Sequence, residues 1–156
     1  MADAMLGTLA KWLRVAGVDC GYAAGMGDDE LVGVARAGRL VLTRDKDLAR
    51  RCGANGLHVP SDALEEQLLQ VLSAVPGALQ GEPLSRCLVC NVPIEDAEVD
   101  DVRDRVPPGV LARTSEFWRC PRCGRVYWAG THVEGMERRL ASIMDRVRAG
   151  LPPDGE

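Results

Sequence analysis

Two Cys-x-x-Cys pairs give the sequence four thiols that could bind a metal ion. They are Cys87, Cys90, Cys120 and Cys123. Paired thiolates at this spacing are typical of a closed tetrahedral zinc site, in which four protein ligands leave no position open for catalysis. Asn91 and Gly124 follow the two pairs, and these residue types most readily adopt the positive φ of a chain that curls around a metal. We therefore predict one structural zinc ion that contributes about 10 kcal/mol to folding.

The 29 residues between the two pairs fit a zinc ribbon whose pairs lie on separate β-hairpins. Two disulfides and a thioredoxin-like redox pair are the alternatives. The doubled motif and two further cysteines, Cys20 and Cys52, favour zinc over both. For Cys20 and Cys52 we expect buried, inert thiols.

Carboxylates in the first 80 residues stand where predicted elements begin or end. The candidates are Asp3, Asp29 within the run Asp28-Asp29-Glu30, Asp45 and Asp47. In a parallel α/β sheet, functional side chains gather at the carboxyl ends of the strands. Convergent carboxylates suit Mg²⁺ or Mn²⁺ and metal-assisted phosphodiester hydrolysis. Taken singly, each acid also fits a helix cap or a partner of a helix dipole.

A basic and aromatic segment surrounds the second cysteine pair. Its arginines are Arg113, Arg119, Arg122 and Arg125, against the single acid Glu116. Four of the six aromatic residues lie in or beside it, namely Phe117, Trp118, Tyr127 and Trp128. We interpret the arginines as phosphate contacts and the rings as a small core that seals the metal. Arg44, next to Asp45, is a further candidate for nucleic-acid binding.

Helices and short strands alternate through the first 75 residues, which predicts an α/β fold with a parallel sheet. A helix is expected over 5–17 with Lys11 and Arg14 on its outer side, and strands are expected over 39–43 and 56–59. Further helices are expected after 28–30, through 48–52 and after a capping box at Asp62-x-x-Glu65. A second box, Thr131-x-x-Glu134, predicts a C-terminal helix.

The predicted domains are a nuclease-type α/β domain over 1–80, a zinc ribbon over 81–130, and a helix over 131–150 that packs back on the body. Proline and glycine crowd between residues 76 and 83, where no regular element could continue. No stretch approaches 18 consecutive apolar residues and no leader pattern opens the chain, so we expect a cytoplasmic protein without a membrane span.

The net charge of −4 argues at first against a nucleic-acid partner. Residues 1–80 hold 8 basic and 10 acidic groups and residues 81–156 hold 11 and 13, so each part is −2. The segment from Arg113 to Arg125 is nevertheless locally +3. Because both signs are sorted along the chain, the mean charge is a poor guide to its partners.

Five segments together resemble the Mut-seven C-terminal RNase domain family. They are Asp3-Ala-Met-Leu-Gly-Thr-Leu-Ala-Lys-Trp-Leu-Arg-Val-Ala-Gly17, Arg39-Leu-Val-Leu-Thr-Arg-Asp45, Ser85-Arg-Cys-Leu-Val-Cys-Asn91, Arg105-Val-Pro-Pro108, and Glu116-Phe-Trp-Arg-Cys-Pro-Arg-Cys-Gly-Arg-Val-Tyr-Trp128. The resemblance extends from Asp3 to about Leu140. It implies a PIN-like nuclease domain joined to a zinc ribbon, with zinc on the four cysteines.

The same resemblance implies Mg²⁺- or Mn²⁺-dependent RNA cleavage with Asp3, Asp29, Asp45 and Asp47 as metal ligands. By analogy of fold with a ribosomal-RNA maturation endonuclease, ribosomal RNA or a ribosomal particle is the expected partner. A non-catalytic RNA- or ribosome-binding module is the main alternative. An adaptor that uses the acidic run from Glu95 to Asp104 is a third.

The sequence departs from the family pattern at its start. Family members carry an apolar strand immediately before the acid equivalent to Asp3, whereas here only Met1 and Ala2 precede it. We expect either that residues upstream of Met1 complete this strand or that Asp3 is poorly held. Displacement of a catalytic group by about 1 Å lowers the rate about 10²-fold.

Overall fold

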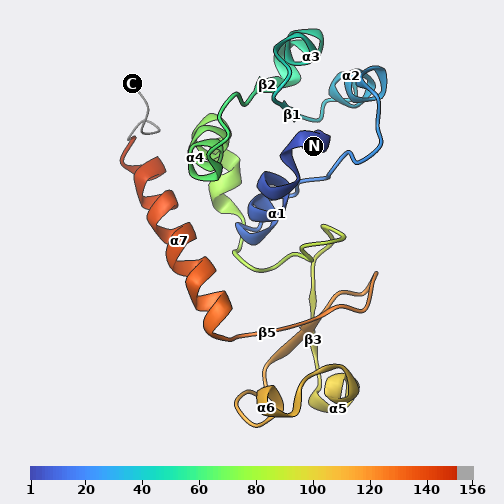
Figure 1. Ribbon diagram of the computed structural model, residues 1–156, viewed down its shortest axis with the longest axis vertical. Coiled ribbons are helices and arrows are strands. Elements are labelled where there is room, and N and C mark those ends of the chain that lie inside the picture. Colours follow the sequence, from blue (N-terminus) through green and yellow to red (C-terminus); the bar gives the residue numbers. More distant parts are fainter. Residues whose placement is uncertain (151–156) are drawn as a thin grey trace.

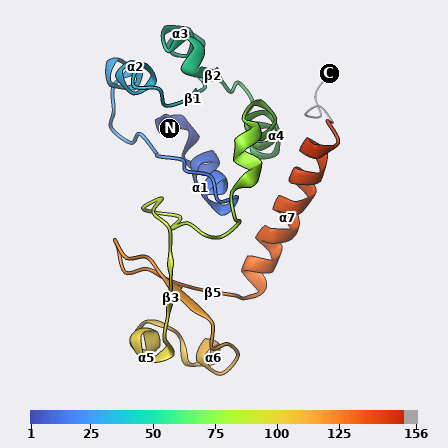
Figure 2. The ribbon, with the colours of Figure 1, turned by 180° about the vertical axis from the view of Figure 1, so that it is seen from behind.

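The computed structural model describes residues 1–150 and shows an α/β body followed by a small antiparallel sheet and a long helix (Figures 1 and 2). The body contains α1 (Gly7–Val15), α2 (Asp28–Arg36), β1 (Val41–Thr43), α3 (Lys46–Arg51), β2 (Gly56–His58) and α4 (Leu64–Ala74). The remainder contains β3 (Glu95–Ala97), α5 (Val99–Val102), α6 (Pro108–Leu111), β4 (Phe117–Arg119), β5 (Val126–Trp128) and α7 (Thr131–Arg148). Short 3₁₀ helices cover Ala4–Leu6, Gly53–Asn55, Pro76–Gln80 and Arg103–Arg105. The predicted α/β class with a β ribbon and a C-terminal helix is confirmed.

The parallel sheet of the body is small, and the first residues of the chain complete it. β1 pairs with β2 in parallel, with Val41 opposite Gly56 and Thr43 opposite His58. On the other side of β1, Ala2 forms parallel bridges to both Leu42 and Tyr22. Residues 1–3 therefore lie between two neighbouring extended segments, as a central strand would.

Backbone hydrogen bonds fix these first residues on both sides. The amide of Leu42 donates to the Met1 carbonyl at 2.8 Å, and that of Asp3 donates to the Leu42 carbonyl at 3.0 Å. On the opposite side, the amide of Ala2 donates to the Gly21 carbonyl at 2.9 Å. The expectation of a poorly held Asp3 is wrong, because three extended residues between two partners are enough to anchor it.

The core of the body is formed by apolar faces of α1, α4 and α7. Leu9, Leu13, Leu68, Leu72 and Ile143 are all buried in one cluster. A second cluster packs α2 and α3 against β1. The helix predicted over 5–17 is confirmed as a 3₁₀ turn that continues into α1, and Gly17 ends it with a φ of 80°.

Three local expectations are wrong. Arg14 was expected on the outer side of its helix, yet it is only 6% exposed, because residues 84–91 cover that side of α1. Asp62 does not cap α4. The N-cap of α4 is Ala63, whose side chain makes no capping hydrogen bond, and Ser61 before it accepts from the amide of Ala63 at 3.0 Å and donates to Glu66. Thr131 is the first residue of α7 rather than its cap, which is Gly130.

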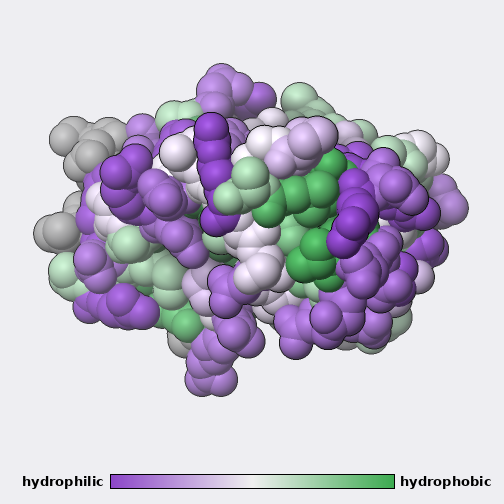
Figure 3. Space-filling model, turned by 90° about the horizontal axis from the view of Figure 1, so that it is seen from below, coloured by the Kyte–Doolittle hydropathy of each residue, from purple (hydrophilic) through white to green (hydrophobic). Residues whose placement is uncertain are grey.

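The ribbon, residues 81–130, carries one Cys-x-x-Cys pair on each of two hairpins. β3, β4 and β5 form an antiparallel sheet in that order, and the second pair lies in the β4–β5 turn. The first pair lies in a smaller hairpin closed by a bridge between Arg86 and Pro93. Of the four rings predicted to form a small ribbon core, Phe117 is buried with Val102 and Val106, whereas Trp118, Tyr127 and Trp128 are half-buried. Seen from the ribbon end, the surface is mostly hydrophilic around a hydrophobic area right of centre (Figure 3).

None of the helices within residues 1–150 has the length and hydropathy that a membrane crossing requires.

Candidate functional site

The structure brings the four predicted cysteine ligands together. All four Sγ atoms lie within 4.8 Å of one another. We call residues 87–91 and 120–124 the first and second knuckles. In the first, the amide of Asn91 donates to the Cys87 carbonyl at 2.9 Å, and in the second, that of Gly124 donates to the Cys120 carbonyl at the same distance. Asn91 and Gly124 have φ values of 65° and 72°, which confirms the positive φ predicted for both.

Hydrogen bonds to the Cys87 sulfur favour its thiolate form, which is the form that a metal binds, whereas the pKa values of Cys90 and Cys120 are raised. The Tyr127 hydroxyl donates to Cys87 Sγ at 3.2 Å, and the amide of Cys90 donates to the same sulfur at 3.2 Å. Burial raises the pKa of Cys87, but hydrogen bonds led by Tyr127 outweigh it and lower that pKa to about 6. Four sulfur donors in this arrangement fit one structural zinc ion.

The first knuckle is held directly against the body by Arg14. Its Nε donates to the Cys20 carbonyl at 2.8 Å, and its Nη1 donates to the carbonyls of Leu88 and Val89 at 2.8 and 3.0 Å. Asn91 Oδ1 accepts from the amide of Cys20 at 3.1 Å. Position and conformation of the first knuckle are thus coupled to the end of α1.

The two remaining thiols behave as the sequence suggests. Cys20 and Cys52 are both buried, and burial raises the pKa of each. Neither belongs to the four-cysteine cluster.

Two of the four candidate acids, Asp3 and Asp45, follow neighbouring extended segments of the parallel sheet. Asp3 is 6% exposed, and its Oδ2 accepts from the Thr43 hydroxyl. The same hydroxyl oxygen accepts from the amide of Asp45 at 3.0 Å. Asp45 itself caps α3, because its Oδ1 accepts from the amides of Leu48 and Asp47 at 2.9 and 2.7 Å. These bonds lower the pKa of Asp45, so it is a carboxylate at neutral pH.

The side chains of Asp29 and Asp47 lie outside this hydrogen-bonded network. Asp29 is 96% exposed at the start of α2 and forms an ion pair with Arg51. Asp47 pairs with Arg50 at 3.1 Å on the surface of α3. Within residues 1–150, no three carboxylates approach one another as the four thiols do. The role of Asp29 and Asp47 as metal ligands remains a prediction.

Sequence reasoning missed two polar residues at this edge. Thr43 joins Asp3 to Asp45, and His58 stands opposite Thr43 at the end of β2. A ring nitrogen of His58, Nε2, lies 3.1 Å from the Arg44 carbonyl oxygen, beside the turn that carries Asp45. Their positions at the carboxyl ends of two predicted parallel strands were the signal that could have found them.

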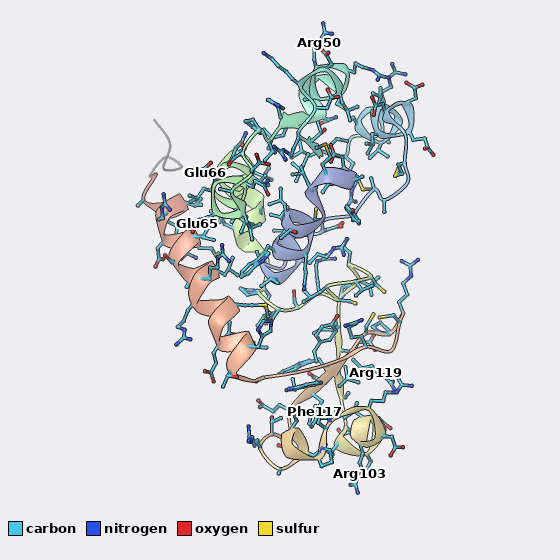
Figure 4. The ribbon with its side chains drawn as sticks, viewed as in Figure 1. Arg50, Glu65, Glu66, Arg103, Phe117 and Arg119 are labelled. Atoms are coloured by element: carbon cyan, nitrogen blue, oxygen red, sulfur yellow. The ribbon has the colours of Figure 1, made fainter. Side chains whose placement is uncertain are left out.

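The candidate RNA-binding arginines differ in their surroundings. Arg113, Arg119, Arg122 and Arg125 are exposed, and none forms an ion pair within the described part of the chain. Arg44 instead pairs with Asp62 at 2.5 Å. Figure 4 places Arg119 in the lower half of the molecule and Arg50 of α3 at its upper end, so the ribbon and α3 are separated along the long axis.

The fold and the sites define an α/β protein with two acids, Asp3 and Asp45, at its sheet edge and a ribbon that can hold one metal ion. A family model described as the Mut7-C RNAse domain matches residues 1–140, and the chain belongs to this family. Searches among curated proteins and among solved structures gave no match. Family membership implies a ribonuclease and agrees with the resemblance noted from the sequence.

Proposed function

We propose that the protein is a metal-dependent endoribonuclease that hydrolyses RNA phosphodiesters at the edge formed by Asp3 and Asp45. The observation that supports this most strongly is the hydrogen-bond network in which the Thr43 hydroxyl donates to the Asp3 carboxylate and accepts from the backbone amide of Asp45. It ties the buried carboxylate of Asp3 to the backbone of Asp45, and both residues follow the carboxyl ends of neighbouring extended segments. The family match to an RNAse domain supports the same reaction.

The donor atoms at this edge fit Mg²⁺ or Mn²⁺, which prefer oxygen ligands. Asp3 Oδ1 accepts one hydrogen bond, from the amide of Met5 at 2.8 Å, and Oδ2 accepts one from Thr43. Each oxygen therefore keeps a lone pair for a cation. When bound, such an ion activates water and offsets the charge that develops on the phosphate. Asp29 and Asp47 are the further proposed metal ligands. To bind the ion, each carboxylate releases its arginine partner.

The ribbon contributes a proposed docking surface for RNA. Its exposed arginines, Arg119, Arg122 and Arg125, supply positive charge that their own acidic neighbours do not neutralise. Phosphate contacts of this kind position a nucleic acid without reading its sequence. Ribosomal RNA or a ribosomal particle remains the proposed partner by analogy of fold alone.

Substitution Asp45→Asn tests the catalytic assignment. Asparagine caps a helix as well as aspartate does, so the variant retains α3 while it loses the charge that holds a cation. We expect cleavage of structured and single-stranded RNA in Mn²⁺ to fall by at least about a hundredfold. Thermal unfolding checks that the variant is folded.

The matched control is Asp101→Asn, which removes one carboxylate from an exposed position on α5 and keeps full activity. Cleavage that survives Asp45→Asn would contradict the assignment. A wild-type protein that binds RNA in a gel shift but never cuts it would establish the alternative, a non-catalytic RNA-binding module.

A further inference from the structure

A cavity of about 440 Å³ lies between the ribbon sheet, the linker around Leu84 and the first turns of α7. The proposed nuclease does not use it. Its walls include Asp96, Trp118, Tyr127, Trp128, Met136 and Glu137. The combination of aromatic rings and carboxylates in one cavity indicates which kind of ligand it can take.

One wall is a row of side chains across the ribbon sheet. Asp96 of β3 pairs with Trp118 of β4, which pairs with Tyr127 of β5, so all three project from the same face. The Tyr127 hydroxyl is engaged by Cys87 and by the amide of Leu88 at 3.1 Å. Tyr127 therefore offers its ring to the cavity, beside the indole of Trp118 and the carboxylate of Asp96.

The floor of the cavity is apolar and its rim is acidic. Trp118, Trp128 and Met136 are half-buried, whereas Asp96 and Glu137 are exposed, as is a third lining acid, Glu82. None of these three acids forms an ion pair within residues 1–150.

Arg86 is the one cation among the lining residues, and its guanidinium group is already engaged. Nε donates to the Gly17 carbonyl at 3.2 Å, and Nη1 donates to the Asn91 carbonyl at 2.5 Å. Because these carbonyls are neutral, Arg86 keeps its charge, and the three acids and this one cation leave the lining with a net charge of −2.

We propose that this cavity binds a linear organic cation, an alkyl chain that ends in an ammonium or guanidinium group. The chain lies on the apolar floor while the charged end reaches the acidic rim and the aromatic faces. A cation–π contact of the same kind occurs between α7 and α1, where the Arg139 guanidinium carbon lies 5.2 Å from the Trp12 ring centroid. RNA is the less suitable ligand, because the three carboxylates repel its phosphates.

Two sources could supply such a group, a lysine or arginine side chain of a basic polypeptide and a free polyamine. The zinc-loaded full chain is titrated with spermidine and, separately, with the peptide acetyl-Gly-Lys-Gly-amide, without RNA. The chain has three tryptophans, Trp12, Trp118 and Trp128, so its indole N–H signals report the site by NMR. We expect shifts at Trp118 and Trp128 and none at Trp12, and the tighter of the two probes identifies the source.

Charge-neutral variants supply the control. Asp96→Asn combined with Glu137→Gln is expected to weaken binding about tenfold, and Glu134→Gln, one turn earlier on α7 and outside the cavity, is expected to leave it unchanged. A norleucine peptide that binds as tightly as the lysine peptide would overturn the proposal. So would shifts produced by AMP and not by either cation, which would identify a nucleobase site. These outcomes are independent of whether the protein cuts RNA.

Discussion

Thr43 connects the two acids of the proposed active site through a single hydroxyl group. It is fully buried, donates to Asp3 and accepts from the amide of Asp45. Thr43→Val keeps the shape but leaves both polar partners without a bond. We expect a loss of about 1–2 kcal/mol in the free energy of unfolding, measured with urea. Because the Asp3 carboxylate then keeps only its bond from the amide of Met5, its orientation is less fixed, and RNA cleavage is expected to fall about a hundredfold.

Thr43→Ser removes the methyl group and keeps the hydroxyl group, so it distinguishes the contribution of one from that of the other. It retains both hydrogen bonds, so its cleavage rate is expected to stay within about tenfold of the wild type. Equal losses of cleavage in the two variants would contradict the role given to the hydroxyl.

At the residue scale, local rules predicted what depends on neighbours in the chain. Asn91 and Gly124 were assigned positive φ from their place after a cysteine pair, and a helix cap was one of the two roles considered for Asp45, which does cap α3. Thr43 was missed because its partner Asp3 lies 40 residues away in the sequence. The ion pair between Asp29 and Arg51 was not predicted for the same reason, because only the packing of α2 on α3 brings these residues together.

At the scale of elements, Arg14 shows where helical periodicity fails. Its position on α1 predicted exposure, and the prediction was wrong because the first knuckle packs on that side. Arg14→Met has a similar length but donates nothing to the carbonyls of Cys20, Leu88 and Val89. We expect it to lower the free energy of unfolding by about 2–3 kcal/mol and to speed zinc release to a chromogenic chelator.

Lys11→Met on the same helix is the control for this variant. Lys11 is exposed and forms no ion pair within the described residues, so its loss is expected to change stability by less than about 0.5 kcal/mol. Zinc release at the wild-type rate from Arg14→Met would show that the knuckle does not depend on this contact.

We expect the ribbon sheet to depend on metal rather than on its own core. Only Val102, Val106 and Phe117 are buried in its cluster, which is too few to stabilise three short strands. Zinc analysis is expected to give one ion per chain. After removal by a chelator, the amide signals of β3–β5 are expected to lose their dispersion in NMR spectra, and Zn²⁺ but not Mg²⁺ restores them. A ribbon that stays ordered without metal would contradict this prediction.

At the scale of the whole molecule, the ribbon is attached to the body at both of its ends. On one side, the amide of Leu84 donates to the Val15 carbonyl at 2.8 Å. On the other, α7 returns along the body and packs on α4, with Arg146 and Glu65 paired at 2.9 Å. The spacing of apolar residues in α7 predicted a helix, but the sequence did not show that this helix packs against α4. The cavity between α7 and the ribbon had no sequence signal, because its walls come from three separate segments.

Four ribbon arginines, Arg113, Arg119, Arg122 and Arg125, are exposed and form no ion pair within the described residues. They predict that RNA binding depends on salt concentration despite the net charge of −4. In the cleavage-deficient Asp45→Asn background, binding of single-stranded RNA is expected to weaken about fiftyfold between 50 and 200 mM salt, a log–log slope of about −3 for four phosphate contacts. Arg119→Gln with Arg122→Gln is expected to reduce the slope by about 1.4. Arg103→Gln is the control, because Arg103 pairs with Asp100. A flat salt response, or equal slopes in the double variant and the control, would place RNA elsewhere on the molecule.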